Sequence, residues 1–283
     1  MSSKMTRTFL LVVLFAICAA AAGPPRRIVS LSPNVTEMLY GIGALNQVVG
    51  ISDYCTYPAG VNRIPSVGGW QNFDLEKIAA LRPDLVIVDD GQDLVAGDHF
   101  QKLGLRVMVV RDSTVQDVYA GIAALGRTTG HEEEAAKLAA ATRAELQRIS
   151  QKTAALPKPK VVLIVDRTPG TLRDLYTATD GGFLAELVGV AGGRIAAPAA
   201  KDGYGKLSKE DLLAIDPDTI LDFIHGIKLP VGDPLEAWRE MGMLRAVRAH
   251  RVHGVNEDFV PHASQRIVLT AALFARLIHP GVQ

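Results

Sequence analysis

Short apolar runs alternate with amphipathic segments along most of the chain, and this alternation predicts the fold. The stretch "RIVSLSP" from Arg27 is typical of a buried strand entering a turn, and Pro33 suits the first turn of the helix "NVTEMLYGIG". Further on, "VVGIS", "LVIVDD" and "RVMVVRD" have the character of buried strands, while "LEKIAALRP" and the segment around "HFQKLG" favour helices. Strands that alternate with helices indicate a parallel α/β sheet.

The sequence pattern changes between Thr128 and Leu156. This stretch starts with acidic residues, has no glycine or proline after Gly130, and predicts one long helix of roughly 25 residues. After "PKPK" the alternation resumes, with "VVLIVD", "TILDF" and "RVHGV" as strands and "GGFLAELVGVAGG" and "WREM" as helices. We therefore expect an α/β protein of two similar lobes, each a parallel sheet flanked by helices, joined by one long helix.

A repeated motif supports two related lobes. The stretch "DLEKIAALRPDLVI" (74–87) matches "SKEDLLAIDPDTIL" (208–221) at an offset of 134 residues, which aligns Glu76 with Glu210. Each copy predicts a short helix, a proline that stops it and a buried strand. The segment "GFLAELVGVAGG" also resembles "NVTEMLYGIGAL" in the same order within its lobe. We interpret the pair as a duplication, although helix-proline-strand junctions also recur by chance in α/β proteins.

The N-terminus has the features of an export signal. Lys4 and Arg7 precede the apolar run "TFLLVVLFAICAAAAG", whose apolar core of about 14 residues is shorter than the roughly 20 needed to span a bilayer. We expect cleavage near Ala22 and a periplasmic location, with a membrane anchor as the alternative. Lipidation at Cys18 is less favoured because Ile17 stands where that signal needs a small residue. The predicted parts are signal peptide 1–22, N-terminal lobe 23–128, connecting helix 129–156 and C-terminal lobe 157–283.

Charge and cysteine content exclude several classes of protein. The chain has 30 basic and 30 acidic residues, and loss of Lys4 and Arg7 with the signal leaves a slight negative excess. Nothing here favours nucleic acid, which would require a clustered basic face. Only Cys55 survives cleavage, so no internal disulfide can form. We expect Cys55 to be a small buried hydrophobe, with a reactive thiol or a metal ligand as alternatives.

The sequence offers little support for catalysis. It contains no GxSxG, HExxH or phosphate-loop motif, and its seven histidines are scattered rather than gathered as metal ligands. A nucleophilic pair of Cys55 and His262 is conceivable, but nothing local favours a thiolate. We therefore expect no enzyme, no resident cofactor and no dedicated metal site.

Three segments carry a family resemblance. "LSPNVTE", "VGGWQNFDLEKIAALRPDLVI" and "EDFVPHASQRI" occur in the same order as in the helical-backbone (class III) periplasmic solute-binding proteins of ABC importers, over about residues 26–279. Such proteins carry cobalamin, haem or iron chelates, and the cobalamin-binding members are the most similar. The resemblance implies a monomer that captures a corrinoid between its lobes and delivers it to the membrane subunits of an ABC importer. Haem or a ferric siderophore is the alternative ligand, and an exported enzyme using Cys55 is less favoured.

The resemblance also gives the repeated glutamates a role. In this family an exposed glutamate on each lobe pairs with arginines of the two membrane subunits, and Glu76 and Glu210 stand at the matching positions. The residues themselves offer a modest argument, because a duplicated chain retains a charge in both copies where both meet a partner. The alternative is that each is a solvated residue in a first helical turn.

The expected binding site lies in the loops that follow the strands. Ligands of parallel α/β sheets bind beyond the carboxyl ends of the strands, and in a two-lobed protein both sets of ends face the cleft. Aromatic rings in these loops suit a planar macrocycle with apolar faces and a polar rim. The predicted ligand-binding residues are Tyr54, Trp70, Asp258, Phe259 and His262.

These five residues differ in how well they match the family. Trp70 stands where the cobalamin-binding members also have tryptophan, whereas Phe259 replaces a tryptophan and His262 an arginine. His262 can be a neighbour of a helix N-cap, a polar ligand contact or an axial ligand, and Asp258 either binds a ligand amide or caps the same helix. If the ligand is haem, Tyr54 or His262 would supply the axial ligand.

Overall fold

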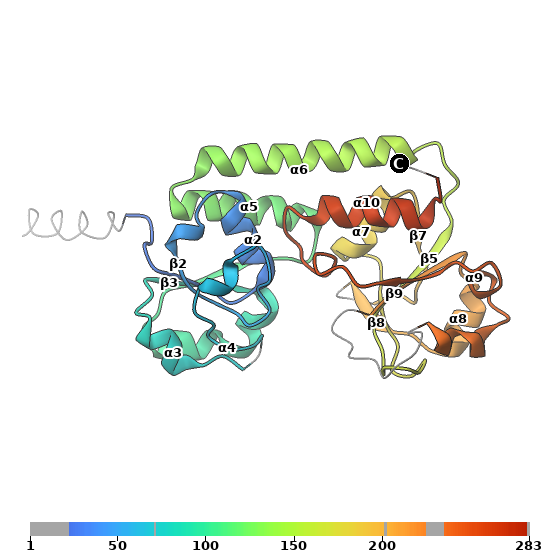
Figure 1. The fold of residues 1–283 in the computed structure, drawn as a ribbon, viewed down its shortest axis with the longest axis horizontal. Coiled ribbons are helices and arrows are strands. Elements are labelled where there is room, and N and C mark those ends of the chain that lie inside the picture. The colour runs from blue at the N-terminus through green and yellow to red at the C-terminus, as the bar shows by residue number, and fades with distance from the viewer. Residues whose placement is uncertain (1–22, 71, 201–202, 225–234, 282–283) are drawn as a thin grey trace, which may run out of the picture.

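The computed structural model describes residues 23–70, 72–200, 203–224 and 235–281. Two sheets form the centres of two lobes, as Figure 1 shows, and the longest helix extends across both. The predictions for the signal peptide and for lipidation at Cys18 lie outside the described residues. No helix in the described ranges has the length and apolar character needed to cross a membrane.

The sheet of the N-terminal lobe is entirely parallel. Its strands lie in the order β2-β1-β3-β4, and every residue of β3 is buried, as expected for a central parallel strand with four consecutive apolar residues before Asp89. The strands are β1 (Ile28–Ser30), β2 (Val48–Ile51), β3 (Leu85–Asp89) and β4 (Val107–Val110). The accompanying helices are α2 (Pro33–Gly41), α3 (Leu75–Ala80), α4 (Asp90–Lys102) and α5 (Val115–Thr129), with 3₁₀ turns at Leu45–Gln47 and Val61–Arg63.

The sheet of the C-terminal lobe has a parallel part and an antiparallel extension. Strands β10 (Val252–Val255), β9 (Thr219–Phe223) and β5 (Lys160–Asp166) are parallel, and β7 (Arg194–Ile195) pairs with β5. Strands β6 (Tyr176–Ala178) and β8 (Tyr204–Lys206) continue the sheet antiparallel, which the sequence analysis did not predict. Its helices are α7 (Phe183–Val190), α8 (Lys209–Ile215), α9 (Arg245–Arg248) and α10 (Ile267–Ile278); the "WREM" segment lies in a 3₁₀ helix, Glu236–Met241.

The connecting helix is α6 (Glu132–Thr153), which has 22 residues and starts later than predicted. Thr128 and Thr129 belong to α5, and Gly130 ends that helix with a left-handed φ of 77°. Three glutamates occupy the first turn of α6, where negative side chains interact favourably with the positive end of the helix dipole. In Figure 1, α6 lies along one side of the molecule, opposite α3 and α8.

A continuous apolar layer joins the two lobes beneath α6. The largest cluster of buried side chains includes Ile122 of α5, Leu146 of α6, Leu187 of α7 and Phe274 of α10. Helix α6 contacts α5, α7 and α10, and in Figure 1 α5 lies beneath one half of its length and α7 and α10 beneath the other half. The lobes are therefore held together by a shared core as well as by a covalent connection.

The repeated motif folds in the same way in both lobes. Shifting α3 and β3 by 134 residues places them on α8 and β9, and Arg82 and Asp216 between them have φ values of 45° and 43°. Both are left-handed residues other than glycine, a conformation that is uncommon for L-residues. Shared geometry at so specific a position supports duplication over chance resemblance.

The aspartates of the motif have equivalent partners. Asp84 accepts a hydrogen bond from the backbone N–H of Arg27 at 3.0 Å, and Asp218 accepts one from that of Lys160 at 2.8 Å. The side chain of each basic residue then donates to a carbonyl at the end of the motif's helix. The acceptor is Leu81, the C-cap of α3, in one copy and Ile215, the last residue of α8, in the other. In each lobe the motif therefore fixes the start of the neighbouring strand.

Candidate functional site

A cleft lies between the lobes at the carboxyl ends of the parallel strands. Its volume is about 630 Å³, within the usual range of ligand pockets. The loops after β1 to β4 line most of it, and the segment between β10 and α10 contributes the rest. The lining residues are Ser32, Pro33, Asn34, Asp53, Tyr54, Thr56, Trp70, Asp89, Asp90, Gly91, Asp112, Asn256, Asp258, Pro261 and His262.

Trp70 is fixed against the wall of the cleft by hydrogen bonds. Its indole N–H donates to Asp89 Oδ2 at 2.9 Å, and its carbonyl accepts from the side chain of Gln92 at 3.3 Å. Asp89 is buried and also accepts the backbone N–H of Gln92 at 2.7 Å. A Cβ on Gly91 would approach the indole within 3.1 Å, so glycine gives the ring its space. The ring is thus preorganised as a broad apolar wall.

The lining is rich in carboxylates. Five aspartates contribute to it, whereas His262 is the one lining residue among those described that can become cationic. Asp112 shares a side-chain hydrogen bond with Asp90 and lies close to Asp89. Burial, that hydrogen bond and the neighbouring negative charges raise the pKa of Asp112 to about 8. The N-terminal wall therefore offers hydrogen-bond acceptors and a negative potential.

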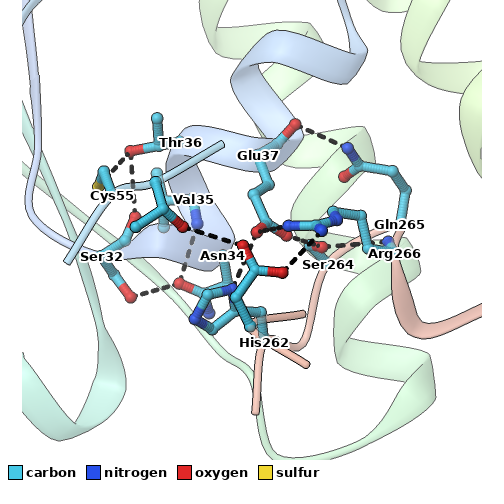
Figure 2. Close-up of polar contacts among 12 residues, drawn as sticks. Ser32, Asn34, Val35, Thr36, Glu37, Cys55, His262, Ser264, Gln265 and Arg266 are labelled. Carbon is cyan, nitrogen blue, oxygen red and sulfur yellow. Dashed lines mark hydrogen bonds and ion pairs between the residues drawn. The ribbon is translucent and has the colours of Figure 1, made fainter. Parts of the chain in front are cut away.

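A polar network connects the lobes at the edge of the cleft, as shown in Figure 2. Glu37 of α2 is buried, and its carboxylate accepts hydrogen bonds from His262 Nδ1 at 2.8 Å, Arg266 Nη1 at 2.7 Å and the Ser264 hydroxyl. Its backbone carbonyl accepts from the Gln265 side chain at 2.8 Å. One carboxylate of the N-terminal lobe thus orders the segment that precedes α10.

Asp258 joins this network rather than capping a helix. It accepts from the Thr56 hydroxyl at 3.0 Å and from Arg266 Nη2 at 3.0 Å, while α10 begins with Arg266 as N-cap and no side-chain cap. Burial acts to raise the pKa of Asp258, but the guanidinium of Arg266 and the Thr56 hydroxyl lower it overall. The carboxylate therefore faces the cleft as an anion.

The predicted ligand-binding residues have different places in the structure. Tyr54, Trp70, Asp258 and His262 all line the cleft, and Tyr54 is 60% exposed. Phe259 is absent from the lining and packs against the core, with the guanidinium of Arg266 at 5.3 Å from its ring centroid. Their contacts with a ligand remain predictions.

Cys55 is buried, as predicted, and its surroundings do not favour a nucleophile. Burial raises the pKa of its thiol to about 11, and its Sγ lies 3.2 Å from the Thr36 hydroxyl. His262 instead engages Glu37 through Nδ1. Among the described residues, no group of three or more His, Cys, Asp or Glu side chains is arranged to hold a metal ion.

The repeated glutamates occupy equivalent exposed positions. Glu76 is the second residue of α3 and Glu210 the second residue of α8, and within the described part of the chain neither forms an ion pair. Figure 1 shows α3 and α8 at the ends of the two lobes, on the side away from α6. This placement leaves both carboxylates accessible to a partner. Their role in docking to a transporter remains a prediction.

Sequence reasoning missed Glu37, Arg266 and Asp112. A signal for Glu37 exists, because it stands within a run of buried α2 residues that includes Val35, Met38 and Leu39. A glutamate among such positions requires a buried partner. The partner is more than 220 residues away along the chain, and sequence spacing could not identify it.

Comparisons with known proteins agree with this architecture. A family model described as "Periplasmic binding protein" matches residues 28–258. An uncharacterized ABC transporter substrate-binding lipoprotein of Bacillus subtilis is 30% identical, covering 90% of this chain and 81% of its own. A vitamin B12-binding protein of Pectobacterium atrosepticum is 25% identical, covering 90% of this chain and 89% of its own. The structure of a periplasmic haem-binding protein from Pseudomonas aeruginosa matches with a TM-score of 0.76 and 23% identity, covering 92% of this chain and 94% of that one.

Proposed function

Because the chain belongs to the periplasmic binding protein family, we propose that it captures a corrinoid of the cobalamin type in its interlobe cleft and delivers it to an ABC importer. The relatives named as a substrate-binding lipoprotein and a vitamin B12-binding protein support both parts of this proposal. They also support a location outside the cytoplasm, which agrees with the signal peptide expected from the sequence. The protein acts as a soluble or lipid-anchored carrier rather than as an enzyme.

The observation that carries the corrinoid proposal is the combination of an indole wall with a carboxylate lining. The face of a corrin ring is largely apolar and suits Trp70, while its rim bears amide side chains whose N–H groups need acceptors. Asp53, Asp90 and Asp258 provide such acceptors around the cleft. Hydrogen bonds from neutral amides to carboxylates are charge-assisted and shorter than neutral pairs.

Haem is the second candidate, supported by Tyr54 and His262 as possible axial ligands and by haem-binding structures with the same fold. Its two propionates oppose this assignment, because they would bring negative charge into a cleft that already holds several carboxylates. Like charges at short range destabilise a complex unless cations separate them. Ferric catecholates face the same difficulty.

Transfer to a transporter would use the exposed glutamates of α3 and α8. Glu76 and Glu210 lie on equivalent ends of two pseudo-symmetric lobes. Two such carboxylates suit a membrane partner that offers two equivalent cationic sites. The membrane subunits of an importer are the partner that we propose.

A parallel titration tests the ligand assignment. The purified mature protein is titrated by calorimetry and absorption with cyanocobalamin, haemin and a ferric catecholate siderophore under one buffer condition. We expect one equivalent of cyanocobalamin to bind, with much weaker binding of the two anionic ligands. Saturable binding of haemin without binding of cyanocobalamin would instead support the haem alternative.

A further inference from the structure

Two carboxyl groups are hydrogen-bonded to each other in the wall of the cleft. Asp90 directly follows β3, Asp112 lies two residues after β4, and a side-chain hydrogen bond joins them. An ionised carboxylate can only accept, so a hydrogen bond between two carboxyls requires a proton on one of them. Both side chains line the cleft. The wall therefore holds a neutral acid beside a carboxylate.

The contacts of Asn34 show where this proton is directed. The side-chain oxygen of Asn34 accepts from the Ser32 hydroxyl and from the Val35 N–H, the latter at 2.9 Å (Figure 2), which fixes the orientation of the amide. Its Nδ2 then donates to Asp112 Oδ2 at 3.1 Å. Because Asn34 is the donor in this contact, the acidic proton of Asp112 is directed to Asp90 instead.

The surroundings of the pair oppose a second negative charge. Asp89 is buried and accepts hydrogen bonds on both oxygens, as an anion does. Among the residues that the structure describes, no lysine or arginine forms an ion pair with Asp89, Asp90 or Asp112. The remaining ionisable groups that act on Asp112 are Asp117 of α5 and Tyr204 of β8, in the opposite lobe. Burial and the nearby Asp112 raise the pKa of Tyr204, which remains a neutral phenol.

We propose that the neutral carboxyl of Asp112 donates to Asp90 and so positions the Asp90 carboxylate as an acceptor for a rim amide of the bound corrinoid. This inference rests on the proposed function and assigns a role to Asp112 within it. The shared proton lets two carboxyls lie side by side with one negative charge between them. Asp112 is a positioning residue because it acts through Asp90.

Capture should therefore weaken in alkaline solution. A ligand that fills the cleft removes water from the pair, and loss of water disfavours the doubly charged form. The pKa of Asp112, about 8 in the free protein, is then higher in the complex. Binding is accordingly strongest below pH 8 and declines as the pH rises above it, with uptake of part of a proton for each ligand bound.

Cyanocobalamin is a suitable probe because it has no group that titrates between pH 7 and pH 9. Calorimetry should show binding up to about 10-fold weaker at pH 9 than at pH 7. Proton uptake is measured at pH 8 from the dependence of the heat on the ionisation enthalpy of the buffer. Infrared spectroscopy of the ligand-free protein should show the carbonyl stretch of a neutral carboxylic acid at pH 7, and this band should fade as the pH rises to 9.

Variants assign these signals to one residue. Asp112→Asn keeps a donor to Asp90 but cannot ionise, so it should remove the alkaline decline, the proton uptake and the infrared band. Asp112→Leu removes the donor and should weaken capture at every pH. Asp180→Asn, at an exposed position, is the matched control and should retain the decline and the band. If Asp112→Leu fails to fold, the comparison of Asp112→Asn with the unaltered protein still decides.

The outcomes separate this inference from the proposed function. An alkaline decline that Asp112→Asn abolishes supports the positioning role. Binding that is equal at pH 7 and pH 9, a decline that Asp112→Asn retains, or no neutral carboxyl band at pH 7 overturns the inference and leaves the corrinoid function standing. Absence of cyanocobalamin binding at any pH overturns both.

Discussion

At the scale of single residues, Trp70 allows the clearest prediction because the structure fixes its ring before any ligand arrives. The hydrogen bond to Asp89 and the space left by Gly91 hold the indole in one orientation. A ligand that packs on this ring therefore pays little conformational entropy to order it.

Substitution of Trp70 tests this wall. Trp70→Ala should weaken corrinoid binding by about 1–3 kcal/mol, the loss typical of a well-packed aromatic contact. Trp70→Phe should reduce the corrinoid affinity less, because phenylalanine keeps an aromatic ring and lacks only the N–H that donates to Asp89. Calorimetry gives the affinities, and thermal unfolding should show that both variants remain folded. Equal affinity in all three proteins would restrict Trp70 to a structural role.

Asp112 makes the stability of the protein depend on pH. An aspartate in the unfolded chain loses its proton near pH 4, at about 3.9, whereas burial and nearby carboxylates raise the pKa of Asp112 to about 8 in the fold. Its contribution to stability is therefore complete below pH 4 and is lost progressively as the pH rises towards 8. Asp112→Asn should remove this loss.

The measurement is urea unfolding between pH 4 and pH 9. At pH 8 we expect Asp112→Asn to be more stable than the unaltered protein by on the order of 1–2 kcal/mol, with the difference shrinking towards pH 4. Asp180→Asn, at an exposed position, is the matched control and should follow the unaltered protein. A constant difference between Asp112→Asn and the unaltered protein at all pH values would refute the ionisation argument.

The residues of the cleft were predictable to different degrees. Tyr54, Trp70, Asp258 and His262 were found because the loops after parallel strands must face a ligand site. Phe259 lies in the same loop as Asp258, but a turn of the chain directs it into the core. The aspartates of the lining lie at or after the ends of strands, yet only tertiary structure shows that their side chains converge.

At the scale of elements, α3 and α8 connect the duplication to the proposed docking. Each helix is capped at its first turn, with Asp74 accepting from the backbone N–H of Lys77 and Ser208 from that of Asp211. These caps hold Glu76 and Glu210 in the same exposed position of each helix.

Charge reversal in both helices should separate capture from delivery. Glu76→Lys combined with Glu210→Lys should leave corrinoid affinity unchanged and impair uptake by the reconstituted importer, because attraction at both rims becomes repulsion. Each ion pair lost between a glutamate and the importer should weaken docking by about 1 kcal/mol. This loss should be smaller at high salt, which screens exposed charges. The matched control is Glu134→Lys, an exposed first-turn glutamate of α6 on the other side of the molecule. Normal uptake by the double variant would exclude the docking role.

The larger elements were predictable because their periodicity extends over many residues. The parallel strands and the repeated helix and strand occur where the pattern placed them, and α6 lies within the stretch predicted to be a long helix. Strands β6 and β8 were missed because each has three residues, too few for alternation to be visible, and they pair only through long-range contacts. The start of α6 was misplaced because Gly130 ends one helix immediately before the next.

At the scale of the whole molecule, the two lobes should move little when a ligand binds. They share an apolar layer through α5, α6, α7 and α10, and additional hydrogen bonds cross between them at Glu37 and from Phe183 N–H to the Ser113 carbonyl. Small-angle scattering with and without corrinoid should show the radius of gyration changing by less than about 1 Å. A larger contraction would mean that the apolar layer can open.

The central claim is that a corrinoid binds between the lobes against the indole of Trp70 and the carboxylates of the surrounding loops. A crystal structure of the protein with bound cobalamin tests it most directly. We expect the corrin ring in the cleft, one face on Trp70, rim amides donating to the lining aspartates, and α6 unchanged. Cobalamin bound elsewhere on the molecule, or an empty cleft at saturating cobalamin, would contradict the claim.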